Sequence, residues 1–253
     1  MIKSKKLSKF KNIKHAFFNK LGGKSTGIYA SLNCGLGSSD KKSNVLKNIQ
    51  IVNQKIKSNT KKIHLLSQTH SNRFHFIDKK SKLKYSKFNG DALITNKANT
   101  PIAILTADCA PILIHDPNNK MIAAIHAGWK GALNGIVINV VKFMVKKGCL
   151  PKNMTVAIGP CISFKNYEIK HDFIKKFLEN DKKNEIFFKR INNKNYFSLK
   201  KYIYSQLKNL DIKKIEVIHK DTFDVKNNFF SARRSISRKE NDYGRNISLI
   251  MIN

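Results

Sequence analysis

Acidic residues are scarce in this sequence. Its 253 residues include 16 Asp and Glu against 49 Lys and Arg, which gives a formal net charge of +33. Only six of the basic residues are Arg, and the Lys residues are spread along the whole chain. Dedicated nucleic-acid surfaces cluster their cations and use the bidentate fork of Arg. The composition therefore favours the codon usage of an A/T-rich genome over a nucleic-acid-binding module, which stays the alternative. No specific nucleic-acid partner is expected, although the charge favours anionic ligands.

Long apolar runs and cysteine patterns are also lacking. The longest apolar stretch, residues 101–115, is interrupted by Thr106, Asp108 and Cys109, so we expect no membrane span. The Lys-rich first 23 residues lack the apolar core of a secretory signal. The four cysteines form no CxxC pair and no regular framework, which favours thiols or metal ligands over disulfides. We therefore expect a cytoplasmic protein.

What the chain does contain is a mixture of strand and helix patterns. Apolar residues make up 41% of it, and no repeat, linker or low-complexity block divides it. We expect a single domain over residues 1–253, with residues 1–12 as a basic N-terminal extension. Apolar patterning predicts strands at residues 13–18, 63–67, 74–78, 92–95, 102–106, 112–115, 121–126, 154–158, 215–219 and 247–252, and helices at residues 43–57, 131–147, 171–180 and 198–207. The turn at residues 116–119 predicts a hairpin. The expected class is α/β or α+β with a mixed central sheet.

Three side chains with metal-ligand chemistry follow expected strands. They stand in the segments Gln68-Thr69-His70, Thr106-Ala107-Asp108-Cys109 and His126-Ala127-Gly128-Trp129-Lys130-Gly131. Three nitrogen and sulfur ligands with an open fourth position are the arrangement of a catalytic zinc site. Taken singly, a Cys in an apolar run is typical of a core, and a His at a strand end is typical of a hydrogen bond. The neighbouring acid, glycines and lone Trp favour ligands instead. We predict a catalytic metal site formed by His70, Cys109 and His126.

Two further clusters are candidates for substrate contacts. Gly159-Pro160-Cys161-Ile162 is a tight turn after a strand, where Cys161 either lines a site or is simply buried. Four of the six Arg lie between Arg233 and Arg245, beside aromatic residues. Paired Arg beside aromatics suits phosphate binding or base stacking, and a solvated basic loop suits the pattern equally. The other six histidines lack a comparable setting and are interpreted as structural.

Together these segments resemble the YfiH family over nearly the whole chain. Its members are described as purine nucleoside phosphorylases, were formerly labelled laccase-like polyphenol oxidases, and include relatives described as peptidoglycan-editing factors. The matching segments run in the family's order: Gly22-Gly23-Lys24-Ser25, Ala30-Ser31-Leu32-Asn33, Gln68-Thr69-His70, Gly90-Asp91-Ala92-Leu93-Ile94-Thr95, Ala107-Asp108-Cys109-Ala110-Pro111, His126-Ala127-Gly128-Trp129-Lys130-Gly131, Gly159-Pro160-Cys161-Ile162, Phe229-Phe230-Ser231 with Arg233-Arg234, and Gly244-Arg245.

The resemblance implies a layered α/β fold, a single domain with mixed β-sheets flanked by helices. It also implies that His70, Cys109 and His126 bind zinc. It implies phosphorolysis of adenosine, inosine or guanosine to a free base and ribose 1-phosphate, with cleavage of methylthioadenosine and deamination of adenosine as related activities. Purine nucleosides and phosphate are then the expected partners. The candidates for phosphate binding are Lys20, Lys130 and Arg233. Asn33 and Asp108 are candidates for holding the sugar or positioning the metal ligands, and Cys161 is a further candidate for a substrate contact.

Two positions depart from the family pattern. Lys20 replaces the usual Arg before the first glycine pair and offers a point charge instead of a fork. Asp221 stands where the family often has Cys.

Two rival enzyme functions stay open. One is a metal-free cysteine hydrolase with a Cys109/His126 dyad. The other is a copper polyphenol oxidase, because Cu²⁺ also accepts imidazole and thiolate ligands.

Overall fold

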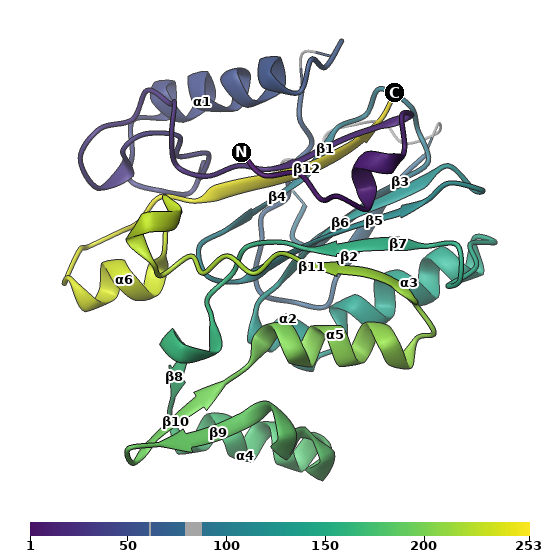
Figure 1. The fold of residues 1–253 in the computed structure, drawn as a ribbon. Helices are drawn as coiled ribbons and strands as arrows, with labels where there is room; N and C mark the ends of the chain where they lie inside the picture. Colours follow the sequence, from purple (N-terminus) through teal and green to yellow (C-terminus); the bar gives the residue numbers. More distant parts are fainter. Residues whose placement is uncertain (61, 79–87) are drawn as a thin grey trace.

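The structure is a computed structural model that describes residues 1–60, 62–78 and 88–253. Its largest sheet has six strands in the order β11-β7-β5-β6-β3-β2 (Figure 1). These strands are β2 (Phe74–Ile77), β3 (Ala92–Thr95), β5 (Ala110–Asp116), β6 (Met121–Ala127), β7 (Thr155–Ile158) and β11 (Lys214–Val217). The outer pairs β11/β7 and β2/β3 are parallel. The three inner pairs, β7/β5, β5/β6 and β6/β3, are antiparallel. The sheet is therefore mixed, as the sequence predicts.

Two smaller sheets and six α-helices complete the described part of the chain. One sheet joins β1 (Ile13–Phe17), β12 (Asn246–Ile252) and β4 (Ile102–Thr106), and the other joins β8 (Glu168–Ile169), β10 (Lys194–Phe197) and β9 (Phe188–Ile191). The helices are α1 (Lys42–Lys55), α2 (Trp129–Leu133), α3 (Ile136–Lys146), α4 (His171–Asn180), α5 (Leu199–Asn209) and α6 (Ala232–Ser237). Single 3-10 turns lie at Leu7–Lys9, Gly27–Tyr29, Phe164–Asn166, Lys182–Phe187 and Val225–Asn227.

Alternation of side chains along the strands builds four layers. On β5, Ile112 and Ile114 face a cluster shared with α3 and α5, and Leu113 faces a cluster shared with the β1-β12-β4 sheet. On β12, Ile250 joins that second cluster, while Leu249 packs in a third cluster with α1. Successive strand residues point to opposite faces, so one apolar strand serves two cores. The layers follow one another in the order α1, the β1-β12-β4 sheet, the six-stranded central sheet, and α3 with α5 (Figure 1).

Most predicted elements are present, and two predictions are wrong. Residues 63–67 form no strand: His64 bridges Ile102, Ser67 bridges Asn89, and no ladder can grow because the two partners lie on different segments. The helix predicted at 131–147 is two helices. Gly135 has φ 83°, a left-handed conformation that ends α2 before α3 begins. The short strands β8, β9 and β10 and the helix α6 were not predicted.

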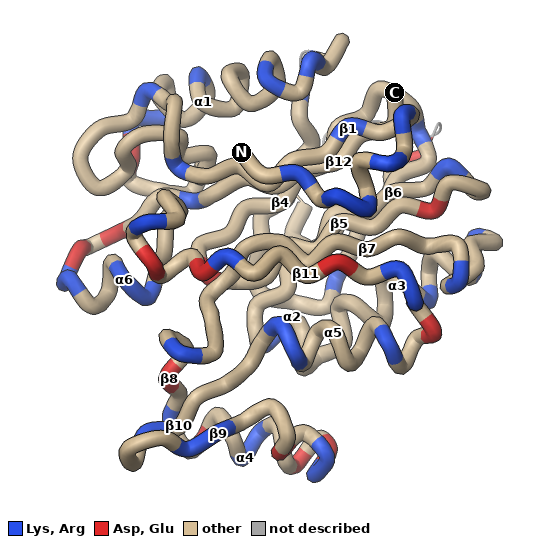
Figure 2. Tube along the Cα trace, viewed as in Figure 1, with Lys and Arg blue, Asp and Glu red and all other residues tan. Residues whose placement is uncertain are grey.

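Residues 1–12 pack on the β-structure. Leu7 is fully buried, and the Glu216 carboxylate accepts hydrogen bonds from the Ser4 hydroxyl and from the amides of Lys5 and Lys6. Lys and Arg are scattered over the outer elements from α1 to α4, and no single element gathers them (Figure 2). No described helix has the length and apolarity needed to cross a membrane.

Candidate metal centre and its pocket

The three predicted metal ligands meet at one end of the central sheet. Cys109 directly precedes β5, and His126 lies near the end of β6. Because β5 and β6 are antiparallel, with Pro111 opposite His126, the start of one strand lies beside the end of the other. His70 reaches the same place from the loop that precedes β2. Strand pairing therefore brings together residues that are distant in sequence.

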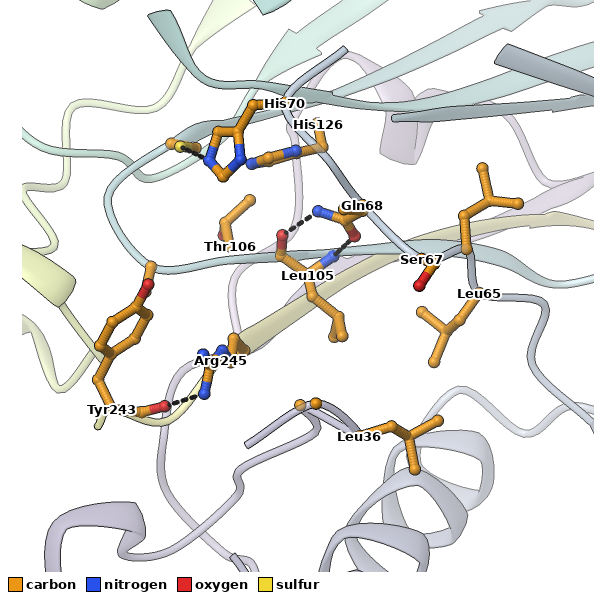
Figure 3. A pocket seen from close by; sticks show the side chains of 15 residues that line it. Leu36, Leu65, Ser67, Gln68, His70, Leu105, Thr106, His126, Tyr243 and Arg245 are labelled. Atoms are coloured by element: carbon orange, nitrogen blue, oxygen red, sulfur yellow. Dashed lines mark hydrogen bonds between the residues drawn. The ribbon is translucent and has the colours of Figure 1, made fainter. Parts of the chain in front are cut away.

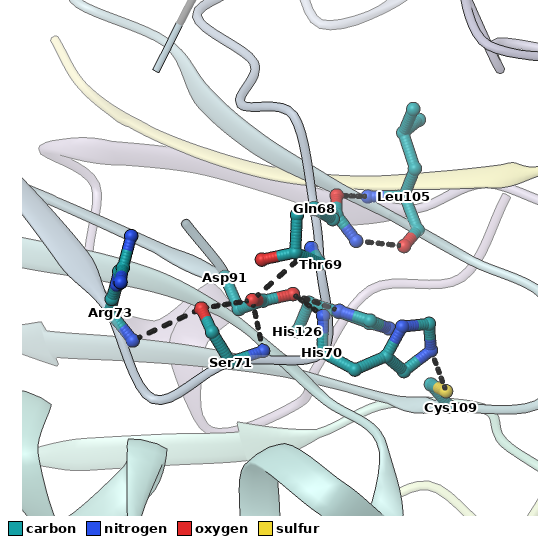
Figure 4. Close-up of polar contacts among 9 residues, drawn as sticks. All are labelled: Gln68, Thr69, His70, Ser71, Arg73, Asp91, Leu105, Cys109 and His126. Carbon is teal, nitrogen blue, oxygen red and sulfur yellow. Dashed lines mark hydrogen bonds and ion pairs between the residues drawn. The ribbon is translucent and has the colours of Figure 1, made fainter. Parts of the chain in front are cut away.

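The ligand atoms of His70, Cys109 and His126, here called the ligand triad, all lie within 4.8 Å of one another. The Cys109 Sγ is 3.7 Å from the His70 Nε2 (Figure 4). Two imidazoles and a thiolate are a donor set that suits zinc, whose bonds to N and S are about 2.0–2.3 Å long. These distances let one ion contact all three atoms after small side-chain shifts. The residues present therefore fit a metal ion.

The absence of a side chain at Gly128 leaves room for the side chains of the ligand triad. A Cβ atom at Gly128 would lie 2.7 Å from the His70 Cδ2 and 2.8 Å from the Cys109 Sγ. Both distances are shorter than real Cβ contacts, so any side chain at this position would push the ligands apart. The glycine in the segment after His126 is thus explained by close packing against two ligands.

Asp91 holds two parts of the ligand triad in place. It precedes β3, which pairs with β6, and its fully buried carboxylate accepts a hydrogen bond from the His126 Nδ1 at 2.7 Å. It also accepts bonds from the amides of Thr69, His70 and Ser71 and from the Ser71 hydroxyl (Figure 4). Occupying Nδ1 leaves the Nε2 of His126 as the nitrogen that can bind a metal. The amide bonds also support His70, whose φ of 58° is uncommon for a non-glycine residue.

The charges of the site are coupled. Burial alone would raise the pKa of Cys109, but the His126 and His70 rings lower it to about 7. Burial would lower the pKa of His126, but the Cys109 thiolate and Asp91 raise it. Burial would likewise raise the pKa of Asp91, yet bonds from His126 and Ser71 hold it at about 2. The Cys109 thiolate and the ionised Asp91 carboxylate favour cation binding, and a metal ion bound at His126 would displace the proton that the raised pKa retains there.

The ligand triad lies in the wall of a hollow of about 350 Å³. Figure 3 shows His70 and His126 at one end of it and Tyr243 and Arg245 at the other. Between them, the amide of Gln68 is fixed by two bonds of 2.7 Å to the backbone of Leu105. Apolar side chains from four leucines and three hydroxyl groups complete the wall: Leu36, Leu65, Leu66 and Leu105, with Ser67, Thr106 and Tyr243. The hollow offers both apolar contact and hydrogen bonds to a ligand.

Asp108 lies next to Cys109 in the chain but is bonded to other elements. Its carboxylate accepts hydrogen bonds from the hydroxyls of Thr222 and Ser231, at 2.6 and 2.9 Å, and from the Arg233 amide at 2.7 Å. Ser231 is the N-cap of α6, so the carboxylate lies at the start of that helix. These bonds fix the turn that carries Cys109.

The structure distributes the other predicted substrate residues widely. Asn33 is fully buried, and its Oδ1 accepts bonds from the amides of Gly35 and Arg245, which themselves line the hollow. The buried Cys161 thiol donates to the Ile162 carbonyl, and burial raises its pKa to about 12. Lys20, Asn33, Asp108, Lys130, Cys161 and Arg233 are not among the described residues that line the hollow.

One of these residues lies at a second hollow, of about 470 Å³, whose lining includes Trp129 and Tyr167. Arg233 lines this hollow, donates to the Glu168 carbonyl and lies over the Tyr167 ring. The Nζ of Lys130 lies 5.6 Å from the centre of the Trp129 ring. Lys20, in contrast, is half-buried, and its carbonyl oxygen accepts hydrogen bonds from the amides of residues 31 and 32.

The departure at Asp221 has a local structural explanation. Its carboxylate accepts bonds from the amide and hydroxyl of Ser163 and from the side-chain amide of Asn166. These bonds tie the segment after β7 to the segment after β11. Because Cys cannot accept several such bonds, the Asp strengthens this junction.

Sequence reasoning missed Asp91 and Gln68 as site residues, and it named Tyr243 and Arg245 only as members of a candidate cluster whose role was left open. One signal was present for Asp91: it is an acid directly before an apolar strand, in the segment Gly90-Asp91-Ala92. Tyr243 and Arg245 belong to the Arg-rich C-terminal cluster, but spacing alone does not tell which Arg of that cluster faces the hollow.

Comparison with known proteins places the chain in a family. Residues 14–253 match the sequence model of a family described as multi-copper polyphenol oxidoreductase laccase. A purine nucleoside phosphorylase of Haemophilus influenzae is 35% identical over 246 residues, covering 95% of this chain and 94% of the relative. A purine nucleoside phosphorylase of Rickettsia conorii is 34% identical over 213 residues, covering 82% and 86%.

A solved structure extends the likeness to the fold. The crystal structure of the YfiH protein of Bacillus licheniformis superposes with a TM-score of 0.87 at 27% identity, over 95% of this chain and 93% of that one. The agreement in sequence and in fold covers almost the full chain, including the segments that carry the ligand triad. The chain belongs to the YfiH family, among homologues of purine nucleoside phosphorylases.

Proposed function

We propose that this protein is a zinc-dependent purine nucleoside phosphorylase that acts in the cytoplasm. Its substrates would be phosphate and adenosine, inosine, guanosine or methylthioadenosine. The observation that carries the proposal is the ligand triad in the wall of a 350 Å³ hollow, in a chain whose relatives bear this name. A hollow of this volume, partly apolar and partly polar, suits a molecule of nucleoside size.

The ligand triad would hold the zinc ion through the His70 and His126 imidazoles and the Cys109 thiolate. A bound zinc supplies Lewis-acid polarisation of an oxygen and leaves one coordination position open. The chain's own contribution is orientation. Asp91 fixes the His126 ring through Nδ1, and Gly128 leaves space for His70 and Cys109.

The overall reaction balances without a further reactant. An oxygen of the phosphate dianion forms a bond to C1′ of the ribose, and the bond from C1′ to the purine nitrogen breaks. The electron pair of that bond leaves with the nitrogen, which takes up the proton lost by the phosphate. The products are ribose 1-phosphate and the free base. Deamination of adenosine, in which the oxygen of water bonds to C6 of the purine and the amino group leaves as ammonia, is a second activity that the same hollow would support.

A cysteine hydrolase is favoured by one specific observation. Asp91, His126 and Cys109 form a carboxylate–imidazole–thiol series, and the lowered pKa of Cys109 is typical of a nucleophile. His70 argues for a metal instead, because its Nε2 lies 3.7 Å from the same sulfur and a dyad has no use for a second imidazole. Resistance to chelators combined with inhibition by iodoacetamide would favour the hydrolase.

A multicopper oxidase is the less favoured function. Such enzymes pass electrons between several copper ions, and each ion needs its own ligands. Within residues 1–60, 62–78 and 88–253, the ligand triad is the one group of three or more His, Cys, Asp or Glu side chains that could hold a metal. This donor set serves a single ion.

The decisive experiment incubates the purified, zinc-loaded protein with adenosine, with and without phosphate, and separates the products by chromatography. Phosphate-dependent release of adenine and ribose 1-phosphate is expected, and inosine or hypoxanthine would report deamination. A chelator should abolish the activity and added zinc should restore it. If zinc-loaded protein releases no base from any of the four nucleosides, the proposal is wrong.

A further inference from the structure

The hollow beside the ligand triad has one permanently charged side chain. Of the described residues that line it, only Arg245 carries a charge that does not depend on pH or on a metal. Moving a phosphate dianion from water into such a hollow costs free energy unless cations or hydrogen-bond donors compensate it. A guanidinium is the side chain best suited to this task, because its fork matches two phosphate oxygens at once.

The guanidinium of Arg245 is held by one edge and leaves the other free. Its Nη1 donates to the Asp242 Oδ1 at 3.0 Å and to the Tyr243 carbonyl oxygen at 2.5 Å. One face of the guanidinium lies over the Tyr243 ring, and its Cζ is 4.3 Å from the ring centre. Within the described part of the chain, its Nη2 and Nε donate to no protein acceptor. Two donors remain for a ligand in the hollow.

The wall around Arg245 is built to hold it in this position. The side-chain oxygen of Asn33, a fully buried residue, accepts bonds from the amides of Gly35 and Arg245, at 3.0 and 2.9 Å. A Cβ at Gly35 would lie 2.4 Å from the Arg245 Cδ, so the absence of a side chain there leaves room for the arginine. Asp242 is itself fixed, because it accepts a hydrogen bond from the Tyr29 hydroxyl.

The other cationic candidates lie elsewhere. The Arg233 guanidinium donates to the Glu168 carbonyl in the second hollow, and Lys130 lies over the Trp129 ring. Neither these residues nor Lys20 is among the described residues that line the hollow of the ligand triad. A phosphate bound by them would not share that hollow with the nucleoside.

We infer that Arg245 binds the phosphate co-substrate, with its Nη2 and Nε, at the end of the hollow opposite His70 and His126. The inference rests on the proposed phosphorylase function. It places the phosphate and the ligand triad on two sides of the bound nucleoside, as Figure 3 places the residues themselves. The hydroxyl of Tyr243 lines the same hollow on the side of Arg245 (Figure 3).

The kinetic test varies phosphate and nucleoside separately in Arg245→Lys and Arg245→Gln. We expect the KM for phosphate to rise about 10-fold in the lysine variant and about 100-fold in the glutamine variant, because the first loses the fork and the second also loses the charge. The KM for the nucleoside should change less than about 2-fold. Arg190→Gln, on the exposed strand β9, is the matched control and should behave as the wild type.

Arg233→Gln separates the two arginines. The inference is wrong if this variant, and not Arg245→Gln, raises the KM for phosphate, or if the KM for nucleoside and that for phosphate rise together in Arg245→Gln. Zinc content and melting temperature, measured on each variant, identify a simple folding defect. If Arg245→Gln has such a defect, the KM for phosphate of Arg245→Lys, which keeps the charge, decides whether Arg245 binds phosphate.

A binding measurement distinguishes this inference from the proposed function. Inorganic phosphate is titrated into the zinc-loaded protein in a calorimeter, without nucleoside. Weakening by about 10-fold or more in Arg245→Gln supports the inference even if the wild type shows no phosphorolysis, which would remove only the proposed function. Equal phosphate affinity in wild type and Arg245→Gln overturns the inference, whatever the enzyme does with adenosine.

Discussion

Two buried aspartates lie next to the ligand triad, and they are bonded in opposite ways. Asp91 accepts a hydrogen bond from the ring of His126 and others from the loop that carries His70. Asp108 is the chain neighbour of Cys109, but its carboxylate accepts bonds from Thr222, Ser231 and the amide of Arg233. One carboxylate therefore bonds directly to members of the ligand triad, and the other bonds to the α6 side of the fold.

The pKa values of the two aspartates differ accordingly. Bonds from His126 and Ser71 outweigh burial at Asp91 and hold its pKa at about 2. At Asp108 burial outweighs the bonds from Thr222, Arg233 and Ser231, so its pKa is raised. Proximity in sequence to a ligand is thus a poor guide to electrostatic influence on it. The pairing of β3 with β6 matters more, because it places Asp91 beside His126.

The largest effect should come from Cys109, the ligand that follows Asp108 in the chain. Cys109→Ala removes the only sulfur donor of the ligand triad, and we expect loss of stoichiometric zinc and a fall in kcat/KM of about 1,000-fold or more. Metal analysis and nucleoside phosphorolysis measure the two effects. The control is Cys34→Ala, at a fully buried thiol in the α1 cluster, which should keep its zinc. Full activity of Cys109→Ala would contradict the metal site.

Asp91→Asn should weaken zinc binding by about 10- to 100-fold, the range expected when the partner of a metal-bound imidazole is changed. The amide cannot supply the negative charge that orients and polarises His126 through Nδ1. Competition with a chromogenic chelator gives the affinity, and the melting temperature in excess zinc reports folding. An affinity within about 2-fold of the wild type would show that the hydrogen bond at 2.7 Å is structural only.

Asp108→Asn should separate the two carboxylates most clearly. We expect zinc affinity to stay within about 3-fold of the wild type, while the free energy of unfolding falls by about 1–3 kcal/mol through weakened bonds to Thr222 and Ser231. Denaturant unfolding of zinc-loaded protein measures the second quantity. A loss of zinc as large as in Asp91→Asn would mean that the turn before Cys109 depends on this charge, and the contrast would fail.

Much of the fold followed from local patterns, because each predicted element had its own apolar period or turn. The hairpin of β5 and β6 and the helix α4 are examples whose bounds were close to those observed. The strand predicted at residues 63–67 was wrong because its backbone partners, Ile102 and Asn89, belong to different segments. Pairing of that kind is set by tertiary structure and leaves no local trace in the sequence.

The same distinction applies to the site. His70, Cys109 and His126 were named from side-chain chemistry and family resemblance, and the structure brings them together. Asp91 was missed because its importance depends on the β3–β6 pairing and not on its neighbours in sequence. Arg245 was not singled out because four of the six Arg fall in one C-terminal stretch, and only the folded chain shows which one lines the hollow.

The smallest predicted effect is the pH dependence of the free energy of unfolding, measured with a chelator present so that no metal is bound. Its sign is opposite for the two aspartates. The folded pKa of Asp91 is below its unfolded value, so its contribution, at most about 2 kcal/mol, is present above pH 3.8 and is lost as pH falls through about 2. The raised pKa of Asp108 has the opposite sign: the folded chain gains a proton first, so stability rises as pH falls through its pKa.

Denaturant unfolding at several acidic pH values should therefore show two opposite trends. The difference in free energy of unfolding between wild type and Asp91→Asn should shrink toward pH 2. The corresponding difference for Asp108→Asn should grow in favour of the wild type as pH falls from neutral toward 3.8. Parallel trends in the two variants would mean that the carboxylates sense the same charges, and that their different hydrogen-bond partners do not set their electrostatics.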